Sequence, residues 1–386
     1  MRWILNHKAK NILLFLISLA SQGIHAQYLS DSTKIRINKS WAQEPAGYTY
    51  PIKTYVPKDS PPNGGFPVCI LLHGNGQSGA SILNKYRGIL KCHALIAPTG
   101  YKNSWNICRE GSNAPDVEMM GDIIDSLQNF VNVNSSKIRI LGVSNGGGLA
   151  NRFFIENDNP NVDIVCAIVS QLNEPQYHLG SFYKPVSSTD PRSKYCGYDS
   201  IVLPLVGRNY LGISNNNDSL IPYMGGFSPV GVNFIEAQRA AFLIAKSQGY
   251  KGPKITGGGS PIGSPTIFEF SYLSGKVVHL MGDAKHSVNK TQLQYIEDYF
   301  SDCQVPTGMI DHETTRILAY PNPFHSSISI QRVSSKASIF SIDDFLGQNV
   351  FVGKFIGDKL DIDLSTLNPG IYTLKIDHKF LRLVKK

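Results

Sequence analysis

Residues 137–146, Lys-Ile-Arg-Ile-Leu-Gly-Val-Ser-Asn-Gly, are the stretch that decides the fold of this chain. An apolar run (137–141) leads into the pentad Gly142-Val-Ser-Asn-Gly146, and a helix is expected to begin near Asn145. A G-x-S-x-G between a strand and a helix predicts a sharp turn that exposes its serine, Ser144, at the carboxyl end of a sheet. The free N–H groups and the positive dipole end of the helix would favour an oxyanion beside that serine. The alternative is a glycine-rich turn with an incidental serine.

The composition is that of a globular protein with a sizeable core, since 42% of the 386 residues are hydrophobic and 17% are charged. This length allows about two or three domains. The formal net charge is +8, and Arg2, Lys8 and Lys10 contribute three of the positive charges, which leaves about +5 after residue 26. The sequence has no long run of lysine and arginine with interleaved aromatic residues, so nucleic-acid binding is not predicted.

Residues 1–26 have the pattern of a secretory signal peptide, because basic residues precede the apolar run 12–20 and small and polar residues follow it. Cleavage is expected near Ala26-Gln27. A membrane anchor is the alternative, but a run of about ten residues is too short to span a bilayer comfortably. No later segment of the sequence is long and apolar enough to span, so we expect a soluble mature protein without a transmembrane segment.

From about residue 46 to 304, apolar runs alternate with helical patterns, which is typical of a mostly parallel, doubly wound sheet. The expected strands are 67–73, 94–98, 137–143, 163–170, 200–207 and 276–281, and the expected helices include 116–130, 234–246 and 291–300. In such sheets the site forms outside the carboxyl ends of the strands. We therefore predict an α/β catalytic domain over residues 27–304.

The pattern changes after residue 304, which predicts a linker over 305–315 and a separate domain over 316–386. This last part contains only short strand-like runs with turn signals, at 327–332, 337–341, 349–352, 359–364 and 370–376. Such spacing predicts a small all-β, sandwich-like domain.

A base and an acid should accompany Ser144, because a serine hydroxyl is a poor nucleophile until an oriented base takes its proton. In sheets of this kind the acid follows the serine and the histidine follows the acid. His286 lies in a loop directly after the last expected strand, from which it could reach back to Ser144. His279, inside that strand, and His178 are the alternatives.

The acid is expected after the strand 200–207. Asp218 is the only carboxylate in the stretch 215–226, where apolar residues and Pro222 would fix its loop. The alternative role for Asp218 is that of an Asx-turn residue in a polar loop. Asp283 is the nearest substitute, although it is very close in sequence to His286.

The loop 73–79, His-Gly-Asn-Gly-Gln-Ser-Gly, follows the first expected strand, and its glycines would let backbone N–H groups approach a ligand closely. We predict that the N–H groups of Asn75 and Asn145 form an oxyanion hole, and that His73 braces the loop. An ordinary turn between strand and helix is the alternative. This chemistry needs no metal and no organic cofactor, and neither is predicted.

The six cysteines include no C-x-x-C zinc pattern. Cys69 and Cys166 lie in apolar strands and are expected to be buried thiols. Cys108 and Cys196 lie in polar, loop-like stretches and are the first candidates for a disulfide, which export would permit.

Several pieces of the chain together carry a family resemblance: 72–78, 101–106, Asp116-Val117, 142–147, 218–226 and His286. Over residues 48–302 the chain resembles the secreted esterases of the poly(3-hydroxybutyrate) depolymerase and feruloyl esterase group, within the α/β-hydrolase fold. The resemblance implies hydrolysis of carboxylic esters and places Trp105 near the substrate. Members usually carry Gly-Thr-x-Asp and Gly-Gly-His-Ser, whereas here an Asn-rich loop precedes Asp218 and Asp-Ala-Lys precedes His286.

The tail carries a second resemblance, on the pieces Ala319-Tyr-Pro-Asn-Pro-Phe324, Phe345-Leu-Gly-Gln-Asn-Val350, 363–372 and Lys385-Lys386. These are similar to the type IX secretion C-terminal sorting domain of Bacteroidota. The resemblance implies passage across the outer membrane by that machinery, followed by release or surface attachment, often with removal of the tail. A sugar-binding β-module is the alternative.

The sequence thus predicts an exported serine esterase. Feruloyl or acetyl esters of plant polysaccharide and polyesters such as poly(3-hydroxybutyrate) are the two competing substrate classes. The alternatives are a surface binding protein with an inactive hydrolase fold and a serine peptidase.

Overall fold

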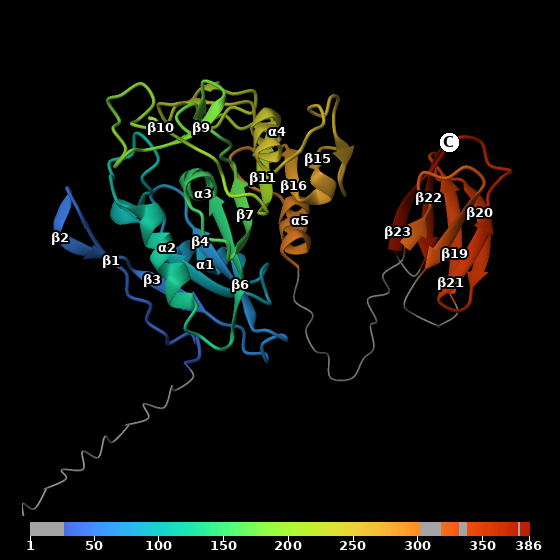
Figure 1. The fold of residues 1–386 in the computed structure, drawn as a ribbon, viewed down its shortest axis with the longest axis horizontal. Helices are drawn as coiled ribbons and strands as arrows, with labels where there is room; N and C mark the ends of the chain where they lie inside the picture. Colours follow the sequence, from blue (N-terminus) through green and yellow to red (C-terminus); the bar gives the residue numbers. More distant parts are fainter. Residues whose placement is uncertain (1–26, 302–317, 332–337, 377–378) are drawn as a thin grey trace, which may run out of the picture. The chain divides into compact units, whose positions relative to one another are not determined.

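The computed structural model describes residues 27–301, 318–331, 338–376 and 379–386. The expected signal peptide (1–26) and linker (305–315) lie outside the described residues. The chain divides into two compact units, residues 1–305 and 306–386 (Figure 1). The domain boundaries at 27–304 and 316–386 remain proposals.

A nine-stranded sheet forms the centre of the first unit, in the order β14-β15-β16-β11-β7-β6-β4-β5-β3. The six inner strands run parallel: β4 (Phe66–Leu72), β5 (Ala94–Pro98), β6 (Val133–Val143), β7 (Val162–Ile168), β11 (Asn209–Asn215) and β16 (Val277–Gly282). Antiparallel strands lie at the two edges: β3 (Ile52–Tyr55) at one, and β15 (Phe268–Tyr272) with β14 (Ser260–Pro261) at the other. The predicted α/β class with a mostly parallel sheet is confirmed.

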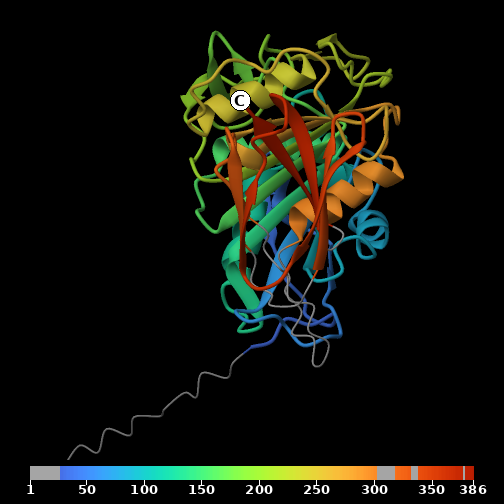
Figure 2. The same cartoon turned by 90° about the vertical axis from the view of Figure 1, so that its right-hand side faces the viewer.

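Helices cover both faces of this sheet: α1 (Gly79–Tyr86), α2 (Asp116–Leu127), α3 (Asn145–Glu156), α4 (Ala237–Ser247) and α5 (Lys290–Phe300). Successive side chains of a strand point to opposite faces, so along β4 the residues Ile70 and Leu72 join one core while Cys69 and Leu71 join the other. The first core includes residues of α2, α3 and α4, and the second includes residues of α1 and α5. In Figure 2, α1 and α5 lie on the same side of the sheet.

Short elements surround the strand ends and the edges. They are the hairpin β1 (Asn38–Trp41) and β2 (Glu44–Thr49), the small sheet of β8 (Tyr177–His178), β9 (Ser181–Lys184) and β10 (Ser200–Val202), the pair β12 (Gly226–Phe227) and β13 (Asn233–Phe234), and the 3₁₀ turns Tyr101–Asn103 and Leu273–Gly275.

One expected central strand is wrong. The run 200–207 forms only β10, which pairs with β9 outside the main sheet. The central strand before Asp218 is β11, Asn-Tyr-Leu-Gly-Ile-Ser-Asn, which interleaves apolar residues with polar ones and a glycine. Its polar residues Ser214 and Asn215 are buried and hydrogen-bonded. A strand whose buried face carries amide and hydroxyl groups lacks the continuous apolar run by which the other strands are recognised.

The second unit is all-β, as predicted, with two antiparallel sheets. One contains β17 (Leu318–Tyr320), β18 (Ser327–Gln331) and β21 (Lys359–Asp363), and the other β19 (Ser338–Asp344), β20 (Asn349–Phe355), β22 (Gly370–Ile376) and β23 (Lys379–Lys385). Residues from both sheets, among them Ile328, Ile362, Ile342 and Leu374, share one apolar core. This is the arrangement of a small sandwich.

Candidate active site

Ser144 lies in a strained turn between β6 and α3. Its backbone has φ 56° and ψ −119°, a conformation that few non-glycine residues adopt and that is costly unless its surroundings enforce it. The neighbouring glycines show what enforces it. A Cβ on Gly142 would lie 2.0 Å from the Gly146 carbonyl oxygen, and one on Gly146 would lie 2.1 Å from the Leu72 carbonyl oxygen. The turn is therefore tight on both sides, as the pentad predicts.

Gly146→Ala is expected to destabilise the fold by about 3 kcal/mol or more, because the added methyl group meets backbone atoms of β4 rather than a flexible side chain. Gly88→Ala is the matched control, since a Cβ there meets no atom within 4 Å. Urea unfolding of both variants measures the difference. Equal stability of the two variants would contradict the packing described for the turn.

His286 joins Ser144 to Asp218. It lies in the loop between β16 and α5, and its Nε2 is 2.8 Å from the Ser144 Oγ. Its Nδ1 is 2.8 Å from the Asp218 Oδ2. An ionised carboxylate can only accept, so Nδ1–H donates to Asp218, and the unprotonated Nε2 accepts the hydrogen bond from the serine hydroxyl. The structure thus brings the three predicted side chains into one hydrogen-bonded chain.

Asp218 is held in place by its own loop. The side chain is 1% exposed. Its Oδ1 accepts hydrogen bonds from the backbone N–H groups of Leu220 (2.8 Å) and Ile221 (3.0 Å), which leaves Oδ2 for His286. Burial alone would raise the pKa of this carboxyl group, but the hydrogen bonds from His286, Ile221 and Leu220 outweigh burial and hold the pKa below its usual value. The Asx-turn contacts through Oδ1 and the contact to His286 through Oδ2 therefore coexist in one residue.

The lowered pKa of Asp218 predicts acid sensitivity. Because the folded-state pKa is lower than the unfolded-state value of about 3.9, the ionised carboxylate stabilises the fold above about pH 4. This contribution is lost as the pH falls through the folded-state pKa. Acidification is therefore expected to destabilise the wild type more steeply than Asp218→Asn, as measured by denaturant unfolding between pH 6 and about pH 3. Parallel curves for the two proteins would contradict the description of Asp218.

The alternative residues have other partners. His279 is buried, its Nε2 lies 3.1 Å from the Tyr223 hydroxyl, and burial lowers its pKa to about 3. His178 is stacked between the rings of Tyr183 and Tyr195. Asp283 is exposed, and its backbone carbonyl accepts a hydrogen bond from Asn217.

The predicted oxyanion-hole residues lie next to Ser144. Asn75 and Asn145 line the same cavity as Ser144, and a Cβ on Gly74 would lie 3.6 Å from the Ser144 Cβ. Within the described part of the chain, the backbone N–H groups of Asn75 and Asn145 donate no hydrogen bond. Two unused donors at the start of a helix and in a glycine-containing loop are suited to hold an oxyanion.

The Asn145 side chain is hydrogen-bonded through both its Oδ1 and its Nδ2. Its Oδ1 accepts from the Trp105 N–H (2.7 Å), and its Nδ2 donates to the Trp105 carbonyl (3.2 Å) and to the Glu110 Oε1 (3.3 Å). These bonds fix the orientation of a residue that lines the cavity beside Ser144.

The predicted contact of Trp105 with substrate is wrong. The side chain is fully buried and does not line the cavity. Its indole N–H donates to the His73 carbonyl (2.8 Å), and its ring lies 4.7 Å from the His73 ring. His73 in turn accepts from the Gly100 N–H (3.1 Å) and contacts the Gly74 carbonyl through Nδ1 (2.8 Å). Trp105 and His73 therefore brace the loop of Asn75 from inside, the role predicted for His73 alone.

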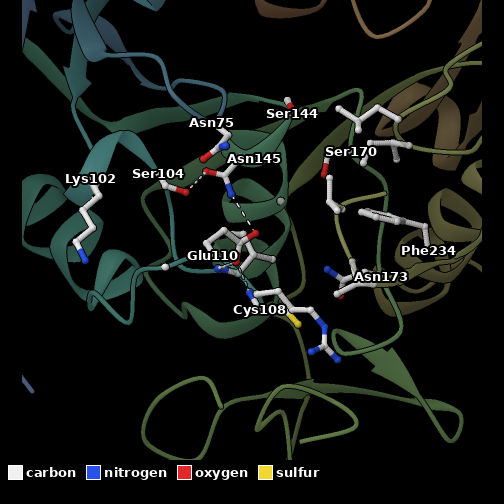
Figure 3. Close-up of a pocket in the computed structure, with 18 residues that line it drawn as sticks. Asn75, Lys102, Ser104, Cys108, Glu110, Ser144, Asn145, Ser170, Asn173 and Phe234 are labelled. Atoms are coloured by element: carbon white, nitrogen blue, oxygen red, sulfur yellow. Dashed lines mark hydrogen bonds between the residues drawn. The ribbon is translucent and has the colours of Figure 1, made fainter. Parts of the chain in front are cut away.

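A cavity of about 590 Å³ opens at Ser144 (Figure 3). Polar lining residues include Ser104, Glu110 and Asn173, and apolar ones include Ile107, Leu220, Ile221, Val230, Val232 and Phe234. The sequence reasoning missed these residues. Leu220 and Ile221 could have been found, because they lie shortly after the acid, whereas Glu110 and the β13 residue Phe234 belong to segments that carry no motif.

Cys108 and Cys196 form a disulfide, as expected, and Cys69 and Cys166 are buried free thiols. Cys108 lines the cavity, and the bridge connects two positions 88 residues apart.

Replacing both bridged cysteines with serine is expected to lower the free energy of unfolding by about 4 kcal/mol, because the bridge closes a long loop in the unfolded chain. Comparing the unfolding of this variant with that of the oxidised wild type checks the expectation. Unchanged stability would show that the bridge does not constrain the unfolded chain.

In the described residues no group of three histidine, cysteine or acidic side chains could hold a metal ion. Among the helices of the same residues, none has the length and apolar character needed to cross a bilayer.

Comparison with known families decides the nature of the tail. Residues 318–386 match the family of secretion system C-terminal sorting domains. The predicted sorting domain is confirmed. This domain indicates export of the chain, followed by secretion or surface attachment, and it supports the type IX secretion machinery as the partner of the tail.

No curated protein matches the sequence of the chain. Among solved structures, a carboxylesterase from Bacillus cereus is similar, with TM-score 0.41 and 11% identity, over 65% of this chain and 93% of that one. A carboxylesterase from Mesorhizobium loti has TM-score 0.39 and 10% identity, over 66% and 95%. A poly(3-hydroxybutyrate) depolymerase from Bordetella parapertussis has TM-score 0.39 and 14% identity, over 58% and 79%.

Proposed function

We propose that the chain is an exported serine hydrolase of carboxylic esters, with Ser144 as nucleophile, His286 as base and Asp218 as the acid that orients it. The observation that carries this proposal is the chain of two 2.8 Å hydrogen bonds from the serine hydroxyl through the imidazole to the buried carboxylate. A base in contact with the nucleophile and a third group in contact with the base are the signature of an activated serine.

In the first half of the reaction, the Ser144 Oγ attacks the acyl carbon while the His286 Nε2 takes the hydroxyl proton. The carbonyl oxygen becomes an oxyanion, which the N–H groups of Asn75 and Asn145 hold. Asp218 stabilises the imidazolium ion. The ester bond then breaks, His286 returns the proton to the leaving alcohol, and an acyl-serine remains.

In the second half, water takes the place of the alcohol. His286 accepts a proton from the water as its oxygen attacks the acyl carbon, and the same N–H groups hold the second oxyanion. The acyl–Oγ bond breaks, the proton returns to Ser144, and the carboxylic acid leaves. Every proton in this cycle is carried by His286.

The lining of the cavity supports an ester with an apolar acyl part. Leu220, Ile221, Val232 and Phe234 offer apolar contacts, whereas Ser104 and Asn173 offer hydrogen bonds. A volume of about 590 Å³ lies in the range of sites for small organic molecules. Both a feruloyl and a hydroxybutyryl group fit this description.

A substrate panel tests the proposal and separates these two classes. The purified protein is given feruloylated arabinoxylan, acetylated xylan and poly(3-hydroxybutyrate), and the ferulate, acetate or hydroxybutyrate released is measured. Release of one acid, lost in Ser144→Ala, supports the proposal and identifies the acyl group. Failure to hydrolyse these polymers and any small ester would favour a binding protein with an inactive hydrolase fold.

A further inference from the structure

The loops that carry Asp218 and His286 start from paired strand ends. β11 and β16 are parallel neighbours, and Asn215 at the end of β11 lies opposite Gly282 at the end of β16. One more backbone hydrogen bond follows, from the Asn216 N–H to the Gly282 carbonyl (2.8 Å). Beyond this point, side chains make hydrogen bonds between the two loops.

Asn215 holds the backbone on both sides of His286. Its side chain is fully buried. Its Nδ2 donates to the carbonyl of Lys285 (2.6 Å) and to the carbonyl of Ser287 (2.8 Å), the residues before and after the histidine. Both amide protons of this one side chain are therefore used to fix the peptide segment from which the imidazole projects.

Gln292 fixes the orientation of Asn215 from behind. Its Nε2 donates to the Asn215 Oδ1 (2.9 Å), and its Oε1 accepts from the Asn289 N–H (3.0 Å) as part of the cap of α5. The contact is tight, because a Cβ on Gly282 would lie 2.3 Å from the Gln292 Nε2 and 2.5 Å from the Asn215 Oδ1. The side-chain oxygen Oδ1 of Asn215 is thereby occupied, so the side-chain nitrogen Nδ2 must face the His286 loop.

Asn217 makes a second clamp on the same loop. Its Oδ1 accepts from the Lys285 N–H (2.8 Å), and its Nδ2 donates to the Asp283 carbonyl (2.7 Å). Lys285 has φ 55°, in the left-handed region that non-glycine residues avoid. Its N–H is bound by Asn217 and its carbonyl by Asn215, so the unfavourable turn immediately before His286 is held at both ends.

We propose that Asn215 is a positioning residue for His286, supported by Gln292 and Asn217. The inference rests on the proposed function, because it assigns to these residues the task of keeping the imidazole between Ser144 and Asp218. It also explains why the Asn-rich loop and the Asp-Ala-Lys segment occur together: the side chains of the first bind the backbone of the second.

Asn215→Asp tests the proposal at nearly constant size. The substitution replaces the two N–H donors with an oxygen that faces two carbonyl oxygens, so the His286 segment is expected to move. For p-nitrophenyl acetate, kcat is expected to fall about 100-fold, with KM changed less than about threefold, because a small displacement of a catalytic group impairs the chemical step more than binding. Near-wild-type kcat in a folded Asn215→Asp protein would overturn the proposal.

Asn217 provides a second test that does not depend on a buried position, since Asn217 is exposed. Asn217→Ala is expected to lower kcat about tenfold. Asn217→Asp keeps the acceptor for the Lys285 N–H and should recover part of this loss. Asn216→Ala is the matched control, because the exposed Asn216 side chain makes no hydrogen bond within the described residues. Equal kcat in the Asn217→Ala and Asn216→Ala proteins would overturn the clamp.

A double-mutant cycle separates positioning from general stability. If Asn215 acts through the imidazole, Asn215→Asp should leave the residual rate of a His286→Ala protein unchanged. The same fold-loss in both backgrounds would assign Asn215 a structural role only. If His286→Ala alone retains full activity, the proposed function itself fails, and this outcome is distinct from failure of the positioning proposal. If Asn215→Asp does not fold, the comparison of Asn217→Ala, Asn217→Asp and Asn216→Ala tests the positioning proposal instead.

Discussion

Ser144→Ala is expected to reduce hydrolysis of p-nitrophenyl acetate by about 10⁴- to 10⁶-fold. The reason is chemical rather than structural. The variant keeps the turn, the cavity and the oxyanion donors, but it has no hydroxyl from which the His286 Nε2, 2.8 Å away, can take a proton. The small rate that remains would come from substrate binding and from direct attack of water on the acyl carbon, with the two backbone N–H groups stabilising the oxyanion that forms.

The measurement is steady-state kinetics of the purified full chain, together with circular dichroism and thermal unfolding to show that the fold is retained. Ser136→Ala is the control, since Ser136 lies on the exposed part of β6 and its hydroxyl, within the described residues, hydrogen-bonds only to Asn134. The control should match the wild type. Unchanged hydrolysis in a folded Ser144→Ala protein would remove Ser144 as the nucleophile.

Asp218→Asn is expected to lower kcat by about 10⁴-fold, because the substitution selects the wrong tautomer of His286. The two N–H groups of Leu220 and Ile221 bind the Oδ1 of Asp218, so an asparagine would keep its oxygen there. Its NH₂ group would then take the place of Oδ2 and donate to the His286 Nδ1. That interaction puts the imidazole proton on Nε2, so Nε2 can no longer accept the proton of the serine hydroxyl.

The matched control is Asp283→Asn, which makes the same chemical change on an exposed carboxylate of the neighbouring loop. It should retain kcat within about twofold, as is usual for surface substitutions. Kinetics of the two variants on p-nitrophenyl acetate therefore decide between the two carboxylates. A large loss in Asp283→Asn with little loss in Asp218→Asn would reverse the assignment of the acid.

The sequence predicted the turn at Ser144 well because its determinants are local. Glycines at 142 and 146, an apolar strand before them and a helix after them all lie within one short segment, and the structure shows backbone atoms where either glycine would carry a Cβ. The loops of Asp218 and His286 were also predicted at one edge of the sheet, because the loops that follow parallel strands meet there, although the strand expected before Asp218 was 200–207 rather than β11.

The prediction failed where tertiary contacts override local pattern. β11 was missed because its buried residues Ser214 and Asn215 are polar and find their partners on distant segments. Trp105 was expected at the substrate, but its indole is enclosed by the loop that it braces. Neither outcome follows from residue type or spacing, because each depends on which segment of the chain happens to pack against that residue.

The clamp of Asn215 and Asn217 on the His286 segment is a further case. In the sequence, three successive asparagines indicate only a polar loop. In the structure, the side chains of Asn215 and Asn217 bind the backbone around Lys285, whereas that of Asn216 makes no hydrogen bond within the described residues. The difference between the three lies entirely in the geometry of the neighbouring strand.

The most direct measurement of the central claim is covalent labelling of the full chain with a fluorophosphonate, followed by mass spectrometry of its peptides. Such a probe phosphonylates serines that a neighbouring base has activated. The account predicts one adduct per chain, on the peptide that contains Ser144, and loss of that adduct in His286→Ala. An adduct on another residue, or labelling of Ser144 at the same rate without the imidazole of His286, would contradict it.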